Sequence, residues 1–425
     1  MIPIKNFRSL SFLVFGLGMT GRSVVNFFNK NKIKNYLVWD DENKDLYKKK
    51  RSKNLSKSLK KVDYIILSPG INLNKQNNKK RFNKYKEKII TDIDLFFLIK
   101  RPFKSIVVTG TNGKSTTCKI IAHLLTKNKY RVFLGGNIGT PVLSLNPKLN
   151  SFVVIEASSF QLAYSKFIFP DFALLLNIAN DHLDWHGNMK NYVSSKFKIF
   201  ERQNNKQYSL LNEKLKSKFN KKKLSGKLII PNKANYQKFK TKLNNTYLKL
   251  DINDENMSFV FELARILKIN KENFFRTLNS FVGLPHRYEI FLKRKNSLFV
   301  NDSKATSFEA TKFALKNSNN IYWIVGGLPK KSDKFNLKNL KKNIIKSYLV
   351  GSKTNFFKKQ LNSQIKLQVT KNLKNSVIQI FKDIKKFNKK RNTILLSPAS
   401  ASFDQFLNFE KRGAEFKKLV KYYAR

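Results

Sequence analysis

Two glycine loops constrain the fold of this chain more strongly than any other feature of its sequence. They lie at residues 16–21 (GLGMTG) and 110–116 (GTNGKST), and each follows a short apolar run and precedes a helical pattern. A strand that turns through glycines into a helix is typical of α/β units, in which the loop lies at the carboxyl edge of a parallel sheet. Since each loop requires a sheet edge of its own, the sequence predicts two nucleotide-type domains.

The first loop has the dinucleotide-binding spacing Gly16-x-Gly18-x-x-Gly21. Its glycines allow a tight turn and the close approach of a phosphate, and Asp40, which ends the next apolar run, is placed to accept a hydrogen bond from a ribose hydroxyl. By itself this pattern favours a nicotinamide-dependent dehydrogenase or another nucleotide-binding module. It accounts only for the N-terminal part of the chain.

Apolar runs that end in small or polar residues alternate with helical stretches along the remaining chain. They are FLVFG, YLVWD, DYIILSPG, SIVVTG, FVVIEAS, FALLLNIAN, IYWIVGG, SYLVG and NTILLSP. This alternation predicts parallel α/β units, and a further set of strands that starts near Leu298 adds a third unit. Lysine-rich and asparagine-rich segments at 41–61, 72–88 and 203–250 interrupt the pattern, and we expect the last to add short strands and loops to the middle domain.

The second loop carries the chemistry of a phosphate site. Backbone N–H groups at the start of the following helix bind phosphate, Lys114 adds a point charge, and the hydroxyl of Ser115 or Thr116 is a ligand for Mg²⁺. Val108 stands where the general template has its first glycine, so the loop reads Gly-x-x-Gly-Lys-Ser. We expect a nucleoside triphosphate here and leave the subclass open.

Two further apolar runs end in potential metal ligands. Glu156 closes FVVIE, and His182 lies in the segment NDHLDWH that follows FALLLNIA, ahead of a helix that carries Lys196. We expect Glu156 and His182 to lie at adjacent strand ends and to hold a divalent ion there, beside the triphosphate. We expect His186 to orient the turn and His123 to be a packed helix residue.

The C-terminal third contains three polar motifs. GLPHR places Arg287, a planar donor suited to phosphate or carboxylate, and NDSKAT presents Asp302, Lys304 and Thr306 at an expected helix start. In SPASASF, N–H groups and the hydroxyls of two serines are candidates for binding a carboxylate; these serines are Ser400 and Ser402.

The composition bears on possible nucleic-acid partners and on the location of the protein in the cell. The formal net charge of +58 would suit nucleic acid, but the lysines are scattered among Asn and Ile rather than gathered in one stripe. The single cysteine, Cys118, excludes an internal disulfide, and no signal peptide or long apolar segment is present. We therefore expect a cytoplasmic protein with no membrane insertion.

Together these motifs resemble the Mur ligase superfamily, and within it the branch that adds D-glutamate. The matching segments are GLGMTG, SPGI, DIDLF, TGTNGKST, GGNIG, IEASSFQL, DHLDWHG, SKFKIF, GLPHR, NDSKAT, SPASASFDQF and NFEKRG, and they cover nearly the whole chain. TGTNGKST alone is shared with folylpolyglutamate synthases, whereas the C-terminal set is specific to the D-glutamate branch.

The resemblance implies three α/β domains: a Rossmann-like UDP-substrate domain at 1–94, a central P-loop ATP domain at 95–282 and a Rossmann-like amino-acid domain at 283–425. It implies ATP-dependent formation of an amide between UDP-N-acetylmuramoyl-L-alanine and D-glutamate, through an acyl phosphate and a tetrahedral intermediate. It further implies two Mg²⁺ ions, a monomer, and no nucleic-acid partner.

The resemblance also implies roles for individual residues. Ser115 and Glu156 would hold one Mg²⁺, and His182 with a carbamylated Lys196 the second. The nucleotide would contact Gly110, Thr111, Asn112, Gly113, Lys114, Ser115, Thr116 and Asn256, with Arg287 and Asp302 reaching it from the third domain once that domain closes. The UDP-muramoyl substrate would contact Thr20, Asp40, Ser68, Gly70, Asn137, Ser158 and Gln161. D-Glutamate would contact Lys304, Thr306, Lys330, Ser402, Phe403 and Phe409.

The sequence departs from the family pattern at three of these places. Glu255 and Phe259 replace the His and Asn that usually accompany the adenine-contacting Asn256. Asp41 and Glu42 replace a Thr-Arg pair beside Asp40, and two added acids are unfavourable near a diphosphate. The spacing in GGLPKKSDKF leaves either Lys330 or its neighbour Lys331 as the D-glutamate contact.

Two other functions stay open at this point. The chain could be a Mur-type ligase for another amino acid, or a basic P-loop ATPase that acts on nucleic acid, although it contains no helicase or RNA-binding motif. Stimulation of ATP hydrolysis by the two ligase substrates, rather than by RNA, separates these possibilities.

Overall fold

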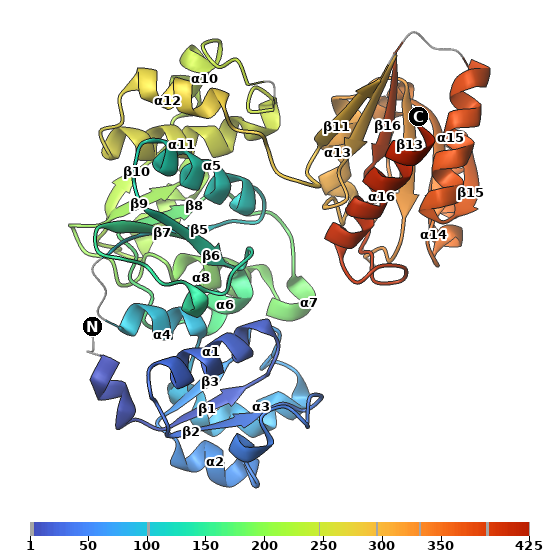
Figure 1. Ribbon diagram of the computed structural model, residues 1–425. Coiled ribbons are helices and arrows are strands. Elements are labelled where there is room, and N and C mark those ends of the chain that lie inside the picture. The colour runs from blue at the N-terminus through green and yellow to red at the C-terminus, as the bar shows by residue number, and fades with distance from the viewer. Residues whose placement is uncertain are drawn as a thin grey trace. The chain divides into compact units, whose positions relative to one another are not determined.

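The predicted alternation of strands and helices is observed in all three parts of the chain that were expected to form α/β units, and the three sheets are built almost entirely from parallel strands (Figure 1). The computed structural model describes residues 4–99, 103–245, 247–294, 296–330, 333–387 and 391–424. The chain forms two units, Met1–Phe281 and Val282–Arg425. The first unit contains two of the sheets and the second contains one.

The N-terminal sheet has four parallel strands in the order β2-β1-β3-β4. Its elements are β1 (Phe12–Phe15), α1 (Met19–Lys30), β2 (Tyr36–Trp39), α2 (Leu55–Lys61), β3 (Tyr64–Leu67), α3 (Gln76–Phe82), β4 (Ile89–Ile90) and α4 (Asp92–Leu98). The register aligns Phe12 with Tyr36 on one side and with Tyr64 on the other. The central position of β1 therefore places the first glycine loop in the middle of the sheet's carboxyl edge.

The central sheet has six parallel strands in the order β10-β9-β8-β5-β7-β6. Its elements are β5 (Phe103–Thr109), α5 (Lys114–Lys127), β6 (Val132–Gly136), the 3-10 helix η4 (Val142–Ser144), β7 (Ser151–Glu156), α6 (Ser159–Tyr164), β8 (Phe172–Leu175), α7 (Leu183–His186), α8 (Met189–Phe197), β9 (Tyr208–Leu211), α9 (Lys216–Lys221), β10 (Lys227–Ile229), α10 (Lys233–Lys240), α11 (Asp254–Ile266) and α12 (Lys271–Asn279). Helix α5, with α11 and α12 packed on it, covers one face of the sheet, and α6 and α8 lie on the other (Figure 1).

One apolar core joins these two sheets. It contains Phe12 and Val14 of β1, Ile93 and Phe96 of α4, and Val107 of β5. The boundary predicted between residues 94 and 95 lies within α4, whose apolar side chains belong to this shared core. Because the core is continuous, the two sheets belong to one unit.

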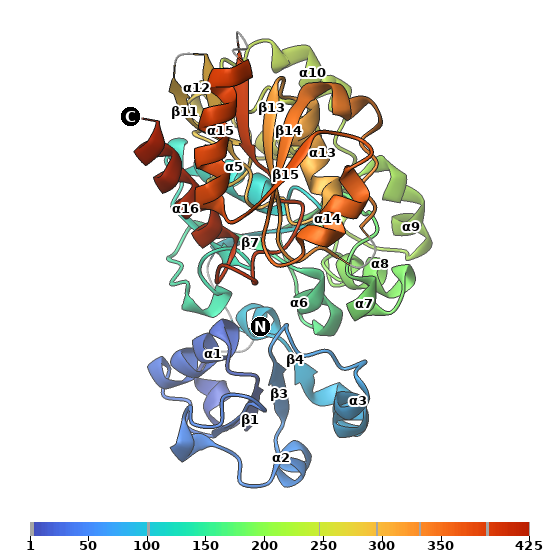
Figure 2. The same ribbon diagram turned by 90° about the vertical axis from the view of Figure 1, so that its right-hand side faces the viewer.

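The second unit is a six-stranded sheet in the order β11-β12-β16-β13-β14-β15, in which only the edge strand β11 is antiparallel to its neighbour. Its elements are β11 (Glu289–Arg294), β12 (Ser297–Asn301), α13 (Phe308–Lys316), β13 (Ile321–Gly326), β14 (Ile344–Val350), α14 (Thr354–Leu361), β15 (Leu367–Lys371), α15 (Leu373–Phe387), β16 (Asn392–Leu396) and α16 (Phe409–Tyr423). Helices α13 and α14 cover one face and α15 and α16 the other (Figure 2).

Two local expectations need correction. The segment 203–250 supplies β9 and β10, as expected, but also the helices α9 and α10. The helix expected to start in NDSKAT begins only at Phe308, where Ser307 is the N-cap and accepts from the N–H of Ala310. Asp302 to Thr306 thus form the turn before that helix. Within the described parts of the chain, no helix is both long and apolar enough to cross a membrane.

Candidate active site at the carboxyl edge of the central sheet

The second glycine loop lies where β5 ends, between the carboxyl ends of β7 and β8. Gly113 caps α5 in the left-handed conformation (φ 83°), and a Cβ there would lie 2.1 Å from Oδ1 of Asn256. Both the conformation and this close approach require glycine. The loop therefore leads directly into the first turn of α5, the helix start at which the sequence predicts that an anion binds. Asn256, predicted to contact the nucleotide, lies against this loop.

Two lysines donate hydrogen bonds to the loop. Nζ of Lys114 is 2.9 Å from the carbonyl oxygens of Gly110 and of Thr111, and Nζ of Lys196 is 2.8 Å from the oxygen of Gly110. Lys196 is only 1% exposed and lies over the ring of Tyr192. Burial, and then the charge of Lys114, lowers the pKa of Lys196 to about 6. At neutral pH, therefore, Lys196 is largely a neutral amine.

Glu156 ends β7 with one carboxylate oxygen unpaired. Oε1 accepts from Nδ2 of Asn137 at 2.9 Å, whereas the buried Oε2 has no hydrogen-bond partner. The backbone N–H of Asn137 also donates to the carbonyl of Glu156. A buried carboxylate oxygen without a donor is costly unless a cation binds it. Glu156 therefore fits a metal ligand, and Asn137 fixes its orientation.

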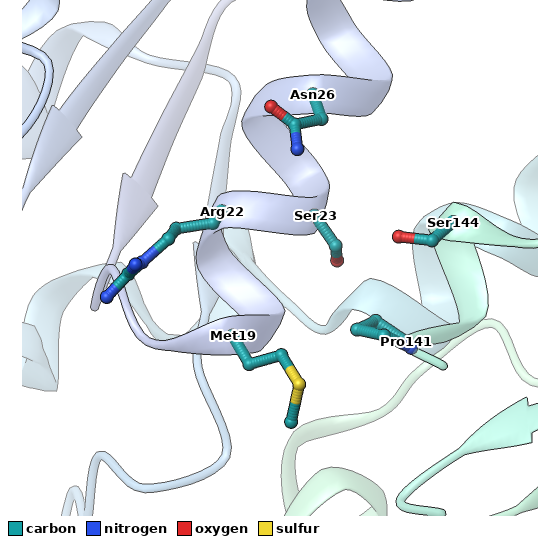
Figure 3. Close-up of a pocket in the computed structure, with 6 residues that line it drawn as sticks. All are labelled: Met19, Arg22, Ser23, Asn26, Pro141 and Ser144. Carbon is teal, nitrogen blue, oxygen red and sulfur yellow. The ribbon is translucent and has the colours of Figure 1, made fainter. Parts of the chain in front are cut away.

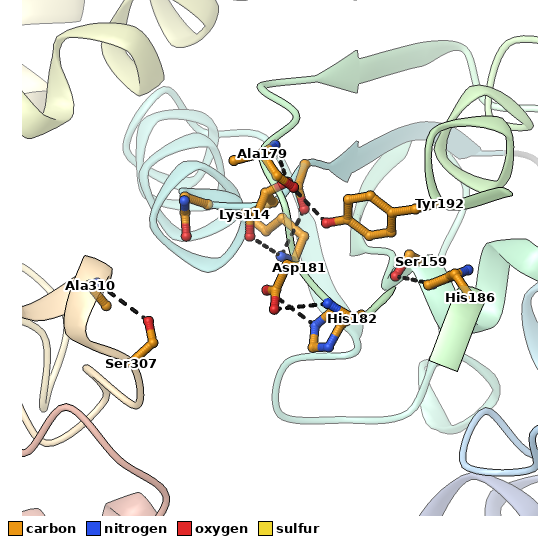
Figure 4. Close-up of polar contacts among 12 residues, drawn as sticks. Lys114, Ser159, Ala179, Asp181, His182, His186, Tyr192, Ser307 and Ala310 are labelled. Carbon is orange, nitrogen blue, oxygen red and sulfur yellow. Dashed lines mark hydrogen bonds and ion pairs between the residues drawn. The ribbon is translucent and has the colours of Figure 1, made fainter. Parts of the chain in front are cut away.

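His182 is held on the other side of the loop. It adopts a left-handed conformation (φ 53°) at the start of α7, and its Nε2 lies 3.4 Å from Oδ2 of Asp181 (Figure 4). The expectation that Glu156 and His182 lie on adjacent strand ends was wrong, because β5 separates β7 from β8. Among the residues that the structure describes, no group of three or more His, Cys, Asp and Glu side chains could hold a metal.

The other two histidines of this unit have structural roles, as the sequence predicted. Nε2 of His186 is 3.0 Å from the hydroxyl of Ser159, and burial lowers the pKa of this histidine to about 4. Nε2 of His123 is 3.0 Å from the carbonyl of Thr277 and from the hydroxyl of Ser280. His123 therefore fixes α5 to the end of α12.

Asn177, which follows β8, was not singled out from the sequence. Its Oδ1 accepts from the N–H of Asn112 at 2.8 Å, and its carbonyl oxygen accepts from the N–H of Thr111 at 3.0 Å. Its Nδ2 donates to Oε2 of Glu255 at 2.9 Å. Asn177 thus holds the phosphate loop from the side of β8.

The first glycine loop is closed by contacts within the N-terminal sheet. A Cβ on Gly21 would lie 1.9 Å from the carbonyl oxygen of Gly16, and the hydroxyl of Ser68 donates to that same oxygen at 2.8 Å. Asp40 accepts from the N–H groups of Leu17, Glu42 and Asn43. Burial raises the pKa of Asp40, but these donors outweigh it, and the pKa lies below its usual range.

The acids that follow Asp40 are less unfavourable than the sequence suggested. Asp41 is paired with Arg81 at 2.7 Å. Of the other predicted UDP-substrate residues here, Thr20 is half-buried and Gly70 is exposed. A cavity of about 380 Å³ lies between α1 and η4 (Figure 3), and Thr20 is not among the residues that line it. Its lining residues are Met19, Arg22, Ser23, Asn26, Pro141 and Ser144.

Ser158 and Gln161, predicted to contact the muramoyl group, form the cap of α6. The side-chain oxygen of Gln161 accepts from the N–H and the hydroxyl of Ser158, and Ser158 accepts from the N–H of Gln161. Gln161 also hydrogen-bonds the buried carboxyl group of Asp92, whose pKa burial raises to about 6. Both side chains therefore already have protein partners.

In the second unit, the predicted residues gather at the carboxyl ends of β12 and β16. The buried carboxylate of Asp302 accepts from the hydroxyl of Ser397 at 2.7 Å and from the N–H of Tyr288. Burial raises the pKa of Asp302 to about 7, although the charge of Arg287 opposes this shift. Nζ of Lys304 lies 3.8 Å from the ring centre of Phe409. The structure thus brings together Arg287 with Asp302, and Lys304 with Phe409.

The remaining predicted residues of this unit differ in accessibility. Ser402 is buried, Thr306 is half-buried, Lys330 is exposed and Phe403 is 72% exposed. Lys331, the alternative to Lys330, lies outside the described residues. The hydroxyl of Ser400 is fully buried and donates within the protein, to the carbonyl oxygen of Gly326, so it was wrongly expected to bind a carboxylate.

Sequence reasoning also missed Arg412 of α16. Its buried guanidinium donates to the carbonyl oxygens of Ser303 and Ser400 and to the hydroxyl of Ser303. Burial lowers its pKa to about 10, so the group stays charged at neutral pH. Arg412 thereby joins the turn after β12 to the turn after β16. Its only sequence signal was the match of NFEKRG to the family.

The chain is similar to known proteins over nearly its full length. A model of the Mur ligase middle domain matches residues 108–275, and a model of the MurD-like N-terminal domain matches residues 11–89. The UDP-N-acetylmuramoylalanine–D-glutamate ligase of Rickettsia felis is 34% identical over 96% of each chain. The ligase of the same name from Agrobacterium fabrum is 32% identical over 98% of this chain and 96% of its own.

Solved structures share the fold at lower identity. The MurF ligase of Thermotoga maritima in complex with ADP has a TM-score of 0.57 at 15% identity, covering 98% of this chain and 99% of that one. The UDP-N-acetylmuramate–alanine ligase MurC of the same organism has a TM-score of 0.57 at 14% identity, with the same coverage. These relatives, and the two family models, assign the fold and the motifs to one group of enzymes: the chain belongs to the Mur ligase family.

Proposed function

We propose that this chain is a cytoplasmic, ATP-dependent ligase that joins D-glutamate to the L-alanyl carboxylate of UDP-N-acetylmuramoyl-L-alanine, a step in the synthesis of the peptidoglycan precursor. The observation that carries the proposal is the near full-length similarity, at 34% identity, to proteins named as this ligase. The phosphate loop with its two lysines and an unpaired carboxylate oxygen supports it.

The proposed reaction has two covalent steps. An oxygen of the L-alanyl carboxylate attacks the γ-phosphorus of ATP, and the bond between this phosphorus and the β-γ bridging oxygen breaks. ADP is released, and the alanyl carboxylate has become an acyl phosphate. The amine of D-glutamate then attacks the acyl carbon, the tetrahedral intermediate expels phosphate, and the amine loses a proton as the amide forms. Lys114 and the N–H groups of the loop stabilise negative charge on the transferring phosphoryl group.

The donor set fits Mg²⁺ at the position that the family implies. The unpaired Oε2 of Glu156 is a hard oxygen ligand, and the buried hydroxyl of Ser115 lies in the first turn of α5. We propose that these two residues hold one ion and that His182 and Lys196 hold a second. Bound Mg²⁺ would neutralise phosphate charge and bring the reacting oxygens together.

We propose that Lys196 carries a carbamate. A neutral amine is the form that adds to CO₂, and the low pKa of Lys196 makes this form available at neutral pH. The product, R–NH–COO⁻, is formed with release of one proton, and its negative charge can bind a cation that an ammonium group would repel. Intact-mass measurement in bicarbonate should find a mass increase that Lys196→Met abolishes; the same increase in that variant would refute the assignment.

The residues predicted for the substrates stay assigned as proposed contacts. UDP-N-acetylmuramoyl-L-alanine would bind at the first glycine loop and at Asn137, and D-glutamate at the carboxyl edge of the sheet in the second unit. Ser158 and Gln161 would contribute only if substrate binding rearranged the cap of α6, because their side chains are already paired. We propose further that the protein acts as a monomer, which light scattering during size-exclusion chromatography would test.

The direct test is phosphate release from ATP by the purified chain with Mg²⁺. We expect turnover only when UDP-N-acetylmuramoyl-L-alanine and D-glutamate are both present, and loss of turnover when the metal is removed with EDTA. L-Glutamate in place of D-glutamate is the matched control. Stimulation by RNA or DNA alone would refute the ligase and favour the nucleic-acid-dependent ATPase that the charge of +58 left open.

A further inference from the structure

We propose that Glu255 is a positioning residue for the phosphate loop, and that it acts through Asn177. The proposal rests on the proposed function only in taking ATP as the ligand of that loop. Glu255 lies in the first turn of α11, next to Asn256, and its side chain is half-buried.

The carboxylate of Glu255 bridges two asparagines that follow neighbouring strands. Oε2 accepts from Nδ2 of Asn177 at 2.9 Å, and Oε1 accepts from Nδ2 of Asn212 at 2.7 Å. Asn177 follows β8 and Asn212 follows β9. The far end of Asn212 is fixed as well, because its Oδ1 accepts from the N–H of Lys214 at 3.0 Å. A single acid therefore holds the carboxyl ends of two strands to the start of α11.

The opposite side of Asn177 contacts the phosphate loop at three points. Its Oδ1 accepts from the N–H of Asn112, its Nδ2 lies 3.3 Å from the carbonyl oxygen of Asn112, and its own carbonyl oxygen accepts from the N–H of Thr111. An asparagine amide has a donor end and an acceptor end of nearly equal size. If it turned over, its NH₂ group would face the N–H of Asn112, and both contacts with that residue would be lost.

Glu255 determines which end of the amide faces which partner. An ionised carboxylate only accepts hydrogen bonds, so it binds the NH₂ group of Asn177 and rejects the amide oxygen. This leaves Oδ1 directed at Asn112. The charge also strengthens the hydrogen bond relative to a neutral pair. Glu255 thus acts on the orientation of the peptide groups of Thr111 and Asn112 through Asn177, which hydrogen-bonds both of these residues.

The same carboxylate forms part of the wall of a cavity of about 360 Å³. The other lining residues include Asn212, Pro231, Lys233, Ser258 and Phe259. The position of Glu255 therefore joins two features of the first unit, a cavity and a phosphate loop.

A double-mutant cycle on the Kd of Mg²⁺-ATP, measured by titration calorimetry with the full chain, tests the inference. Gln at 255 carries an NH₂ group that competes with those of the two asparagines, so Glu255→Gln should weaken binding about tenfold. Asn177→Ala should weaken it by a similar factor, and the double variant by no more than about threefold beyond either single change. Additive losses, or unchanged affinity in Glu255→Gln, would overturn the proposal.

Hydrogen exchange of the loop gives an independent readout in a single variant. Glu255→Gln should exchange faster than the unsubstituted chain in peptides that cover residues 110–114. Glu262→Gln, which removes an acid paired with Arg265 further along α11, is the matched control and should leave the loop protected. Unchanged protection in Glu255→Gln, or equal loss in the control, would also overturn the proposal. Neither experiment requires amide formation, so they fail separately from the proposed ligase activity.

Discussion

The two glycine loops have the same local backbone structure but differ in the charged side chains around them. Each follows a parallel strand, contains a glycine in the left-handed region (Gly16 at φ 93°, Gly113 at φ 83°) and opens a helix. At the first loop, Asp40 is paired with three backbone N–H groups. At the second, two lysines share the oxygen of Gly110, and one oxygen of Glu156 has no partner.

This difference suits the two proposed roles, in which the first loop binds the substrate and the second takes part in phosphoryl transfer. A carboxylate saturated with internal donors is rigid and has a lowered pKa, which suits a scaffold for a substrate handle. A buried carboxylate oxygen without a donor is unfavourable by itself and becomes favourable when a cation binds it, and the charge of Lys114 favours a phosphate group at the same loop. The glycine spacing alone therefore does not distinguish a binding loop from a catalytic one, whereas the charges around it do.

The largest effect is expected from removing the charge of the second loop. Lys114→Ala should lower kcat for ligation by at least about a thousandfold, because the donor to the transferring phosphoryl group is lost. Steady-state kinetics of amide formation measure this, and circular dichroism shows whether the fold is intact. A folded variant that keeps more than a tenth of the activity would place the chemistry elsewhere.

The second prediction concerns the pH dependence of stability at Lys196. Burial and Lys114 lower its pKa to about 6, so between pH 6 and about 10 the unfolded chain holds a proton that the folded chain lacks. The unfolding free energy should therefore rise with pH by up to about 1.4 kcal/mol per unit from this group.

Lys196→Met removes this dependence. In CO₂-free buffer the variant should be more stable than the unsubstituted chain near pH 6.5, and the difference should shrink as the pH approaches 9. Urea unfolding at a series of pH values measures it. Parallel stability curves for the two proteins would show that Lys196 stays protonated in the fold.

A smaller and different effect is expected at the first loop. Asp40→Asn replaces an acceptor by an amide whose NH₂ group faces N–H donors, which should cost about 1–3 kcal/mol of stability. The KM for UDP-N-acetylmuramoyl-L-alanine should rise about tenfold while kcat changes little, because the acid takes no part in the chemical step. A fall in kcat as large as that of Lys114→Ala would show that Asp40 does take part in the chemical step and that the two loops do not differ in role.

The smallest effect is expected at the partly exposed pair of Arg81 and Asp41. Arg81→Ala should change the unfolding free energy by less than about 1 kcal/mol, since such pairs contribute little. It leaves Asp41 unneutralised near the diphosphate, so the KM for the UDP substrate should rise about twofold to threefold at low salt. The rise should fade at high ionic strength. A KM that does not depend on salt would indicate that Asp41 lies away from the bound substrate.

The sequence predicted the central strands better than the edge strands. Apolar runs identified β1, β5, β7, β8, β13 and β16, which are buried within their sheets. Strands β4, β6, β11 and β15 were not identified, and each of them is the last strand of its sheet. Of the other two edge strands, β10 was expected only as one of the short strands of segment 203–250, and β2 was identified from YLVWD. An unidentified edge strand such as β15 has a neighbour on one side only and mixes polar with apolar residues (LQVTK), so no continuous apolar run marks it.

The sequence located the site residues that stand in local motifs and missed those that act by long-range contact. Lys114 was found because it follows the glycines of a strand-to-helix loop, and Glu156 because it ends an apolar run with a polar residue. The contact of Asn177 with Glu255 joins residues 78 positions apart, and no local pattern indicates it. The motif match likewise assigned Gln161 to the substrate. A motif does not show that the side-chain oxygen of Gln161 already accepts a hydrogen bond within the cap of α6.

The proposed ligase forms its amide through an acyl phosphate made from ATP. The most direct measurement uses UDP-N-acetylmuramoyl-L-alanine labelled with ¹⁸O in its alanyl carboxylate, together with Mg²⁺-ATP and D-glutamate. Mass spectrometry of the released phosphate should find one ¹⁸O atom for each amide formed, because the attacking carboxylate oxygen leaves with the phosphate. Amide formation with unlabelled phosphate, or phosphate release without amide, would contradict the account.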